Sequence, residues 1–375
     1  MNIKTTLKTS VAAAALMALM APAAQAGGVG SSDAFDTTIS GHFNKVALYH
    51  DNGEDDGIYQ ADNSASMSRA RIVSKGKINE ALSVSGVFEW GMQAATSSSI
   101  DPYDGVGAGT ANGSESGSTN FFGLRHSYLA FTHKQFGKFT IGHTSEASDG
   151  ITEINGVGNL QYGTTGLYAG SVTLVNSSTK ARGSDVGAFG VSADGTRTSV
   201  FRYNTPTFAG ITLGVSHSNE QNSGIDAKYS GKFGGIAVDA GIGYKNTAGS
   251  STTQDAQWGG SITVAHDSGI SADFSYSELD MVTGTNRDPQ GYMVGLGYAA
   301  DLTSMGKTQF RVAYGESEDA TAKDDELTTW VIGVEQAVAK GVAVYGGYQN
   351  DSIDQAAGVS YDDVTTVFAG TKVVF

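Results

Sequence analysis

The chain has 375 residues, of which 51 are glycine, 4 are proline and none is cysteine, and its formal charge is −15. The lack of cysteine excludes disulfide scaffolds, thiolate zinc sites, iron–sulfur clusters and a cysteine nucleophile. The acidic balance argues against nucleic-acid binding, because the phosphate backbone would repel the chain. A hydrophobic content of 39% is too low for a helical membrane protein, and 9% aromatic residues is too many for a disordered chain.

The first 26 residues have the features of a secretory signal peptide. Lys4 and Lys8 form a positive start, residues 11–21 are apolar, and residues 24–26 (AQA) form an A-x-A cleavage site. The apolar stretch is too short to cross a bilayer as a helix. We therefore expect a signal peptide over 1–26 and a single domain over 27–375. The mature domain carries −17, two units below the full chain, because the signal peptide holds two lysines and no acid.

Beyond the signal peptide the recurring pattern has period two, which indicates half-buried strands. No apolar run there approaches the roughly 18 residues of a membrane helix. Most of the alternating segments are close to the length that a tilted membrane strand needs. The sixteen expected strands are 36–49, 68–77, 81–91, 122–132, 138–143, 197–204, 211–218, 225–232, 236–244, 257–265, 271–279, 292–300, 308–315, 327–336, 342–349 and 364–375.

The connections between these segments alternate in length. Every second one is a short turn, as at 79–80 and 134–137, whereas the others are mostly long and polar, as at 92–120 and 146–195. Outer-membrane barrels separate short periplasmic turns from long outer loops in this way, and soluble sandwiches have no reason to do so. An even strand number lets the last strand close onto the first. The sequence therefore predicts an all-β, 16-stranded antiparallel transmembrane β-barrel.

The two faces of the strands support this prediction. Arg69, Arg71 and Lys75 share one parity of their strand, while Ala70 and Ile72 share the other. A water-filled interior beside a lipid-facing exterior gives such a pattern. In the last strand the apolar face holds Val367, Ala369, Val373 and Phe375, with Lys372 on the opposite face. Aromatic residues expected at the membrane interfaces are Tyr49, Trp90, Tyr128, Tyr203, Tyr276, Tyr298, Tyr314, Trp330 and Tyr348.

Several segments resemble the Gram-negative general (non-specific) outer-membrane porins. Residues 201–210 (FRYNTPTFAG) resemble the family's "rYdsPxFaG" signature. Residues 125–131 (RHSYLAF) and 136–142 (FGKFTIG) look like its "RqAyvGL…fGtltlG" hairpin. Residues 149–154 (DGITEI) are similar to the start of the third loop in some relatives, and Phe375 is similar to the family's terminal assembly signal.

The resemblance covers essentially the whole mature chain, although the "PEFGG" loop tip of enteric porins is absent. It implies a homotrimer in the outer membrane of a Gram-negative bacterium, in contact with membrane lipid and lipopolysaccharide. It also implies that the barrel-assembly machinery reads Phe375, and that a long third loop over 146–195 folds into the lumen and sets the constriction.

A transverse electric field across this constriction is the expected mechanism. Acids on the third loop would face basic residues on the wall, and such a field orients dipolar solutes and penalises apolar ones. The expected loop acids are Glu146, Asp149 and Glu153. The expected wall residues are Arg69, Arg71, Arg125 and Arg202, with His42 and Lys75 as weaker candidates. The net negative charge predicts weak cation selectivity that fades as salt screens it.

Passive diffusion of small hydrophilic solutes and ions is the expected function. A substrate-selective channel of the same fold and a surface adhesin are the alternatives; the first would need a row of aromatic residues along the lumen. No enzyme is expected, since Walker A and H-E-x-x-H motifs are absent. Residues 266–269 (HDSG) place His and Asp directly beside Ser, which predicts a turn rather than a catalytic triad.

No cofactor or metal is expected inside the barrel, but the outer loops hold clustered acids. Carboxylates suit Ca²⁺ or Mg²⁺, which would bridge the loops to lipopolysaccharide phosphates, while a solvated acidic rim is the alternative. A triple variant in which Glu54, Asp55 and Asp56 are changed to their amides tests this. If it still binds lipopolysaccharide in a calcium-dependent manner, the first cluster is only a solvated acidic rim. The clusters are Asp51, Glu54, Asp55 and Asp56; Asp324, Asp325 and Glu326; and Asp362 and Asp363.

Overall fold

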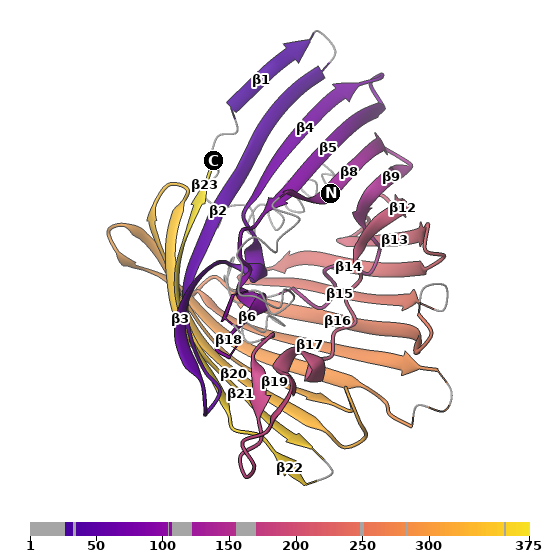
Figure 1. Cartoon of the computed structure of the whole chain (residues 1–375). Helices are drawn as coiled ribbons and strands as arrows, with labels where there is room; N and C mark the ends of the chain where they lie inside the picture. Colours follow the sequence, from indigo (N-terminus) through magenta and orange to yellow (C-terminus); the bar gives the residue numbers. More distant parts are fainter. Residues whose placement is uncertain are drawn as a thin grey trace.

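A computed structural model describes residues 27–32, 35–103, 105–106, 122–154, 170–247, 251–282, 284, 286–355 and 358–375. The signal peptide expected over 1–26 lies outside these residues. Strands dominate the described chain and curve around a common axis (Figure 1). No helix in the described part is long and apolar enough to cross a membrane.

Sixteen strands of the described chain form one closed antiparallel barrel. Each pairs with the next, and β23 pairs with β2, with Lys45 opposite Thr371, so no edge remains open. They are β2 (Phe35–Asp51), β4 (Arg69–Lys77), β5 (Leu82–Met92), β8 (Phe122–His133), β9 (Gly137–Ser145), β12 (Arg197–Asn204), β13 (Ile211–Ser218), β14 (Ser223–Phe233), β15 (Ile236–Asn246), β16 (Gln254–His266), β17 (Ile270–Met281), β18 (Gln290–Thr303), β19 (Gly306–Glu318), β20 (Glu326–Ala339), β21 (Val342–Gln355) and β23 (Val364–Val374). All sixteen expected strands are confirmed.

The shorter elements lie before the barrel or in its loops, and the sequence analysis did not predict them; several are too short to show a period. The strands among them are β1 (Gly27–Ser32), β3 (Asp56–Asp62), β6 (Ile100–Asp101), β7 (Gly105–Val106), β10 (Thr173–Val175), β11 (Arg182–Asp185) and β22 (Val359–Ser360). Three single turns of 3-10 helix are η1 (Ser64–Ser66), η2 (Ser97–Ser99) and η4 (Val186–Phe189).

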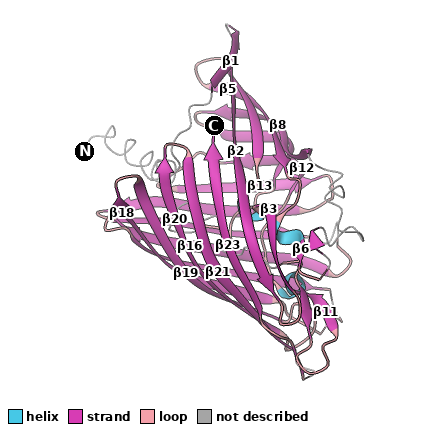
Figure 2. Cartoon of the chain, turned by 60° about the vertical axis from the view of Figure 1, so that its left-hand side comes forward, coloured by secondary structure: helices cyan, strands magenta, loops and turns pink. Residues whose placement is uncertain are grey.

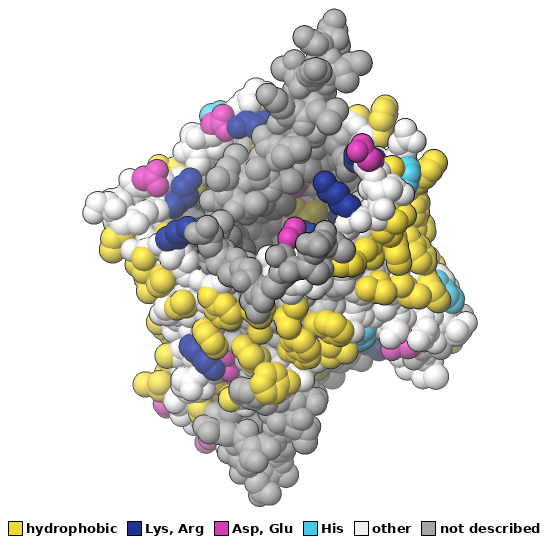
Figure 3. All heavy atoms as spheres, turned by 90° about the horizontal axis from the view of Figure 1, so that it is seen from above, with side chains coloured by type: hydrophobic (Ala, Val, Ile, Leu, Met, Phe, Trp, Pro, Cys, Tyr) yellow, Lys and Arg dark blue, Asp and Glu magenta, His cyan; other side chains and the backbone are white. Residues whose placement is uncertain are grey.

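Side chains alternate along the strands between an apolar exterior and a polar interior. On β17, Ile270 and Phe274 are exposed, whereas Ser271, Asp273 and Ser275, on the opposite face, are buried. Apolar side chains accordingly gather on the outer flank of the wall (Figure 3). The exterior is the surface that contacts lipid, so hydrophobic residues can remain exposed in the isolated chain without cost in the membrane.

Aromatic residues lie on the outer face, with one exception among those expected there. Exposed examples near the two ends of the strands include Tyr203, Tyr298 and Trp330. Tyr128 of β8 was expected at a membrane interface. It lies opposite Val87 of β5 and faces the interior of the barrel, and its ring lies below the Lys138 ammonium. This expectation was wrong because Arg125 is an extra residue at a bulge in β8, which breaks the simple alternation and places Tyr128 on the inner face.

Short turns and long loops lie at opposite ends of the barrel, as expected (Figure 2). At the turn between β8 and β9, Gly137 has φ +87°, and a Cβ there would meet the Asn204 carbonyl oxygen at 2.2 Å, so glycine is required. The turn predicted at residues 266–269 is present between β16 and β17. Phe375 ends at the same side, where it exchanges backbone hydrogen bonds with Gly41.

Candidate pore constriction

A buried carboxylate organises the basic residues of one inner wall. The register places Arg71 of β4 opposite Glu89 of β5, and Glu89 opposite His126 of β8. A bulge after Glu89 brings Arg125 to the same point. Arg71 Nε donates to Glu89 Oε2 at 2.5 Å, and Arg125 Nε donates to Glu89 Oε1 at 2.8 Å. Arg69 Nη1 lies 3.7 Å from the same carboxylate.

This arginine cluster, defined as Arg69, Arg71, Arg125 and Glu89, has a net charge of +2. Glu89 has no exposed side-chain surface, whereas 43% of the Arg71 side chain is exposed. Burial of the carboxylate strengthens its attraction for the three guanidinium groups and holds them against the wall. Met67 also contributes, since its carbonyl accepts from Arg69 Nε at 3.1 Å and its sulfur accepts from Arg125 Nη1 at 3.1 Å.

Glu146 and Arg202 lie away from this cluster, at the point where the third loop leaves β9. The Glu146 carboxylate is buried, and Lys245 Nζ lies 2.6 Å from it. It also accepts the backbone N–H of Thr196 at 3.1 Å, which ties the two ends of the loop together. Arg202 Nη1 donates to the carbonyls of Ser145 and Glu146. Both residues face inward, and their contacts fix the base of the loop.

Three further carboxylates gather on the third loop: Asp149, Glu153 and Asp194. Arg197 Nη2 lies 3.7 Å from Asp149, and Asp194 accepts the N–H of Thr152 at 2.9 Å. Glu153 keeps an exposed surface, but desolvation by the surrounding barrel, together with the negative charges of Asp194 and Asp149, raises its pKa to about 7. Burial also raises the pKa of Asp194. Asp149 lies close enough to Arg125 for the two charges to interact.

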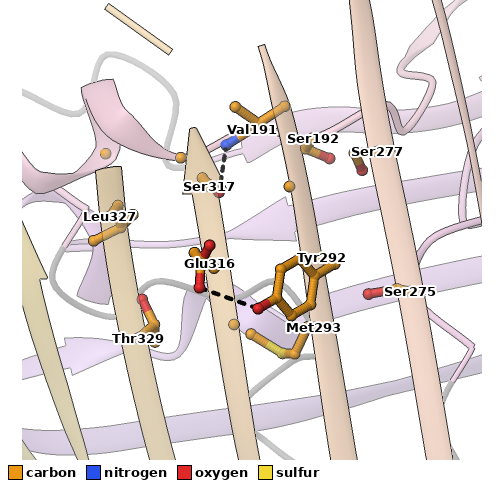
Figure 4. Close-up of a pocket in the computed structure, with 14 residues that line it drawn as sticks. Val191, Ser192, Ser275, Ser277, Tyr292, Met293, Glu316, Ser317, Leu327 and Thr329 are labelled. Atoms are coloured by element: carbon orange, nitrogen blue, oxygen red, sulfur yellow. Dashed lines mark hydrogen bonds between the residues drawn. The ribbon is translucent and has the colours of Figure 1, made fainter. Parts of the chain in front are cut away.

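Hydrogen bonds attach both described ends of the third loop to the inner wall. Ile154 N–H donates to Ser261 Oγ at 3.1 Å, and Gln257 Nε2 donates to the carbonyl of Ala193 at 2.8 Å. Val191 N–H donates to Ser317 Oγ beside a cavity of about 180 Å³ between loop and wall (Figure 4). The loop therefore lies against the lumen side of β16 to β19 at these points. Its residues 155–169 lie outside the described chain.

The middle of the third loop turns outward and contacts other loops at the outer mouth. Arg182 Nη2 lies 2.8 Å from Asp55, and Lys180 Nζ lies 2.8 Å from Asp362, so two of the clustered outer acids pair with loop cations. A buried apolar cluster anchors this hairpin: Val172, Leu174, Val186 and Phe189 with Leu327, Ile353 and Val364. Among the described residues, no group of three or more His, Asp or Glu side chains could hold a metal ion.

Sequence reasoning missed the residues that organise the site. Glu89 could have been found, because it is the one charged residue of the segment 81–91 and its parity is that of Ser83 and Ser85. Asp194 and Arg197 lie at the far end of the third loop, and no periodic pattern links them to Asp149. Met67 acts through its carbonyl and sulfur, which sequence patterns do not report.

Solved structures of outer-membrane proteins have the same fold. An anion-selective porin from Comamonas acidovorans is 16% identical, with a TM-score of 0.59 over 91% of this chain and 100% of the other. OmpT, an outer membrane protein of Vibrio cholerae, is 17% identical, with a TM-score of 0.58 over 92% and 99%. Salmonella typhi OmpF, in a complex with daunomycin, is 14% identical, with a TM-score of 0.57 over 92% and 99%. No curated protein sequence matches significantly.

The sequence itself matches one family model over most of its length. Residues 12–356 match the model described as Gram-negative porin, which is more than nine-tenths of the chain. The match agrees with the closed barrel, its polar interior and its apolar exterior. The barrel thus forms a passive, water-filled channel in the outer membrane, and the chain belongs to the Gram-negative porin family.

Proposed function

We propose that solutes cross this porin through a neck between the arginine cluster and the acids of the third loop. The observation that carries the proposal is the Glu89 carboxylate, which holds Arg69, Arg71 and Arg125 at one level of the inner wall. Asp149 and Glu153 supply negative charge on the loop. A cationic wall facing an anionic loop gives a transverse field, which favours hydrated, dipolar solutes over apolar ones.

Glu146 and Arg202 take a different part in this proposal. Both are held by contacts at the base of the third loop, with Glu146 paired to Lys245. They position the loop so that Asp149 and Glu153 reach toward the wall. Loss of either would therefore change the width of the neck through the loop, rather than by removing a charge from the permeation path.

The contacts of the aromatic residues that face inward favour a general diffusion pore over a substrate-selective channel. Tyr345 and Phe368 face inward, but both are packed in an apolar cluster with Val46, Leu48 and Ala61. Buried in this way, these two rings offer no surface along which a solute could slide, and Tyr128, which also faces inward, is a single ring rather than a row. The pore needs no cofactor and has no enzymatic role in this proposal, and a purely adhesive role would leave the charged interior without a purpose.

We further propose that the mature domain begins at Gly27 and assembles as a homotrimer. OmpT of Vibrio cholerae has been solved in a trimer form, with 18% identity and a TM-score of 0.56. Phe375 would be the signal for the barrel-assembly machinery. Its position supports this role, because the terminal residue completes the pairing of the last strand with the first. Lipid and lipopolysaccharide would surround the trimer.

Planar-bilayer recording tests the function directly. The purified protein should insert in discrete conductance steps, and neutral sugars below a cutoff size should lower the conductance in proportion to the viscosity they add. Competition between solutes that saturates at low concentration would favour a substrate-selective channel. Absence of steps from protein that is folded and heat-modifiable would favour the adhesin.

A further inference from the structure

A second basic site lies below the arginine cluster, toward the short turns that face the periplasm. A cavity of about 830 Å³ opens there on the inner wall between β4 and β9. Its charged lining is Arg71, Lys75, Lys77, Lys138 and Asp36. Cavities of a few hundred to about 1,000 Å³ are the size at which proteins bind small ligands.

The strand register explains why the cavity is concave and why its cations converge. Lys77 of β4 pairs with Ser83 of β5, Ser83 with Thr132 of β8, and Thr132 with Lys138 of β9. The two lysines therefore stand on one row, three strand spacings or roughly 14 Å apart, with short side chains between them. Lys75 pairs with Ser85 one row above. The short side chains of Ser83 and Ser85 form the floor of the cavity, and the longer lysine side chains form its two sides.

The protein balances the positive charges of this cavity only in part. Within the described chain, no ion pair is formed by Lys75, Lys77 or Lys138. Asp36, which lies opposite Lys75 in the register of β2 and β4, is the one carboxylate in the lining, and Arg71 is already bonded to Glu89. Three lysines against one acid leave a local charge of +2 inside a protein whose overall charge is negative. Lys138 Nζ also lies over the Tyr128 ring, 5.9 Å from its centroid.

We infer that this cavity is a binding site for small multivalent oxyanions, such as a tricarboxylate, on the periplasmic side of the neck. The lysine ammonium groups would bind separate carboxylates, and the hydroxyls of Ser83 and Ser85 can donate hydrogen bonds to oxygens that reach the floor. Three separated cations favour a ligand with several charges over a monovalent anion, which can contact one or two of them at a time. The inference rests on the proposed conducting pore.

Citrate is the probe, with gluconate as the monovalent comparison, in bilayers at 0.1 M KCl. Millimolar citrate should reduce single-channel conductance, and equal gluconate should change it little. The double substitution Lys75→Gln with Lys138→Gln should raise the half-blocking citrate concentration at least about fivefold, because each charge pair about 4 Å apart in water contributes roughly that factor. The matched control, Lys134→Gln with Lys307→Gln, removes two lysines at the short-turn end of the barrel and outside the cavity, and should leave the block unchanged.

A second variant distinguishes citrate binding at a defined site from non-specific electrostatic attraction of citrate to the wall. Ser85→Leu fills the floor without changing a charge, so it should weaken citrate block while the zero-current potential in KCl stays the same. Equal effects of citrate and gluconate, or equal losses in the two double variants, would overturn the inference. A protein that conducts but ignores citrate would refute the anion site alone, whereas one that never conducts would refute the proposed pore.

Discussion

Replacing Arg71 and Arg125 together by serine should shift the pore strongly toward cations. The two side chains are bonded to Glu89, and their removal changes the net charge of the arginine cluster from +2 to 0. For an ion passing about 8 Å away in water, each unit charge contributes about 0.5 kcal/mol before screening. A Debye length of about 10 Å at 0.1 M salt reduces the sum for two charges to about 0.5 kcal/mol.

That energy acts with opposite sign on the two ions of a salt. The cation-to-anion permeability ratio should therefore rise about fivefold at 0.1 M KCl, and by less than about 1.5-fold at 1 M, where the Debye length is about 3 Å. Zero-current potentials in KCl gradients measure this ratio. Conductance should also rise, because two long side chains are removed from the neck.

A matched control tests whether location, rather than total charge, is responsible. Arg182→Ser with Arg287→Ser removes two arginines from outer loops and changes the net charge of the protein by the same amount. This control should shift the potential far less at 0.1 M. If the conductance and the zero-current potential of the Arg71 and Arg125 variant are unchanged, the arginines do not line the neck. The same conclusion follows if the control variant shifts the zero-current potential by an equal amount.

Three other predictions concern the titration of the loop, the unmodified pore and its assembly. Because the pKa of Glu153 is raised to about 7, lowering the pH from 8 to 6 protonates this carboxylate and should reduce cation selectivity. The Glu153→Gln variant should lose this pH-dependent change in selectivity. A change that persists in the variant would show that another group titrates. The unmodified protein should be weakly cation-selective in dilute KCl and less so in concentrated KCl, and an anion-selective potential in dilute salt would show that the arginine wall outweighs the net charge. Deleting Phe375 should lower the yield of heat-modifiable trimer in outer membranes, and an unchanged yield at low expression would remove its role as a signal.

The barrel was predictable from sequence because a membrane strand must repeat its pattern. Each strand needs one apolar face, so Val367 and Val373 on one parity and Lys372 on the other already show which side meets lipid. Turns that need a positive φ, such as the one at Gly137, favour glycine and so indicate in the sequence where one strand ends and the next begins. These constraints are local, and local patterns are what a sequence reports.

The contacts of the proposed neck were predictable only in part, because they are not local. Arg69 and Arg71 follow from strand parity, but Arg125 reaches Glu89 through a bulge that no alternation shows. In the third loop, Glu146 has the same charge as Asp149, yet its carboxylate is paired with Lys245 of a distant strand. Which loop acid faces the arginines depends on such partners, and they are known only once the barrel is closed.

The position of Arg71 in the conducting path is the central claim, and cysteine chemistry tests it most directly. The chain has no native cysteine, so Arg71→Cys introduces a single thiol. Phe201 of β12 is 51% exposed on the outer face, and Phe201→Cys provides the control. A negatively charged, membrane-impermeant methanethiosulfonate reagent is added during bilayer recording. We predict discrete decreases in conductance for Arg71→Cys and none for Phe201→Cys. Full labelling of Arg71→Cys, verified by mass, with unchanged conductance would contradict the account.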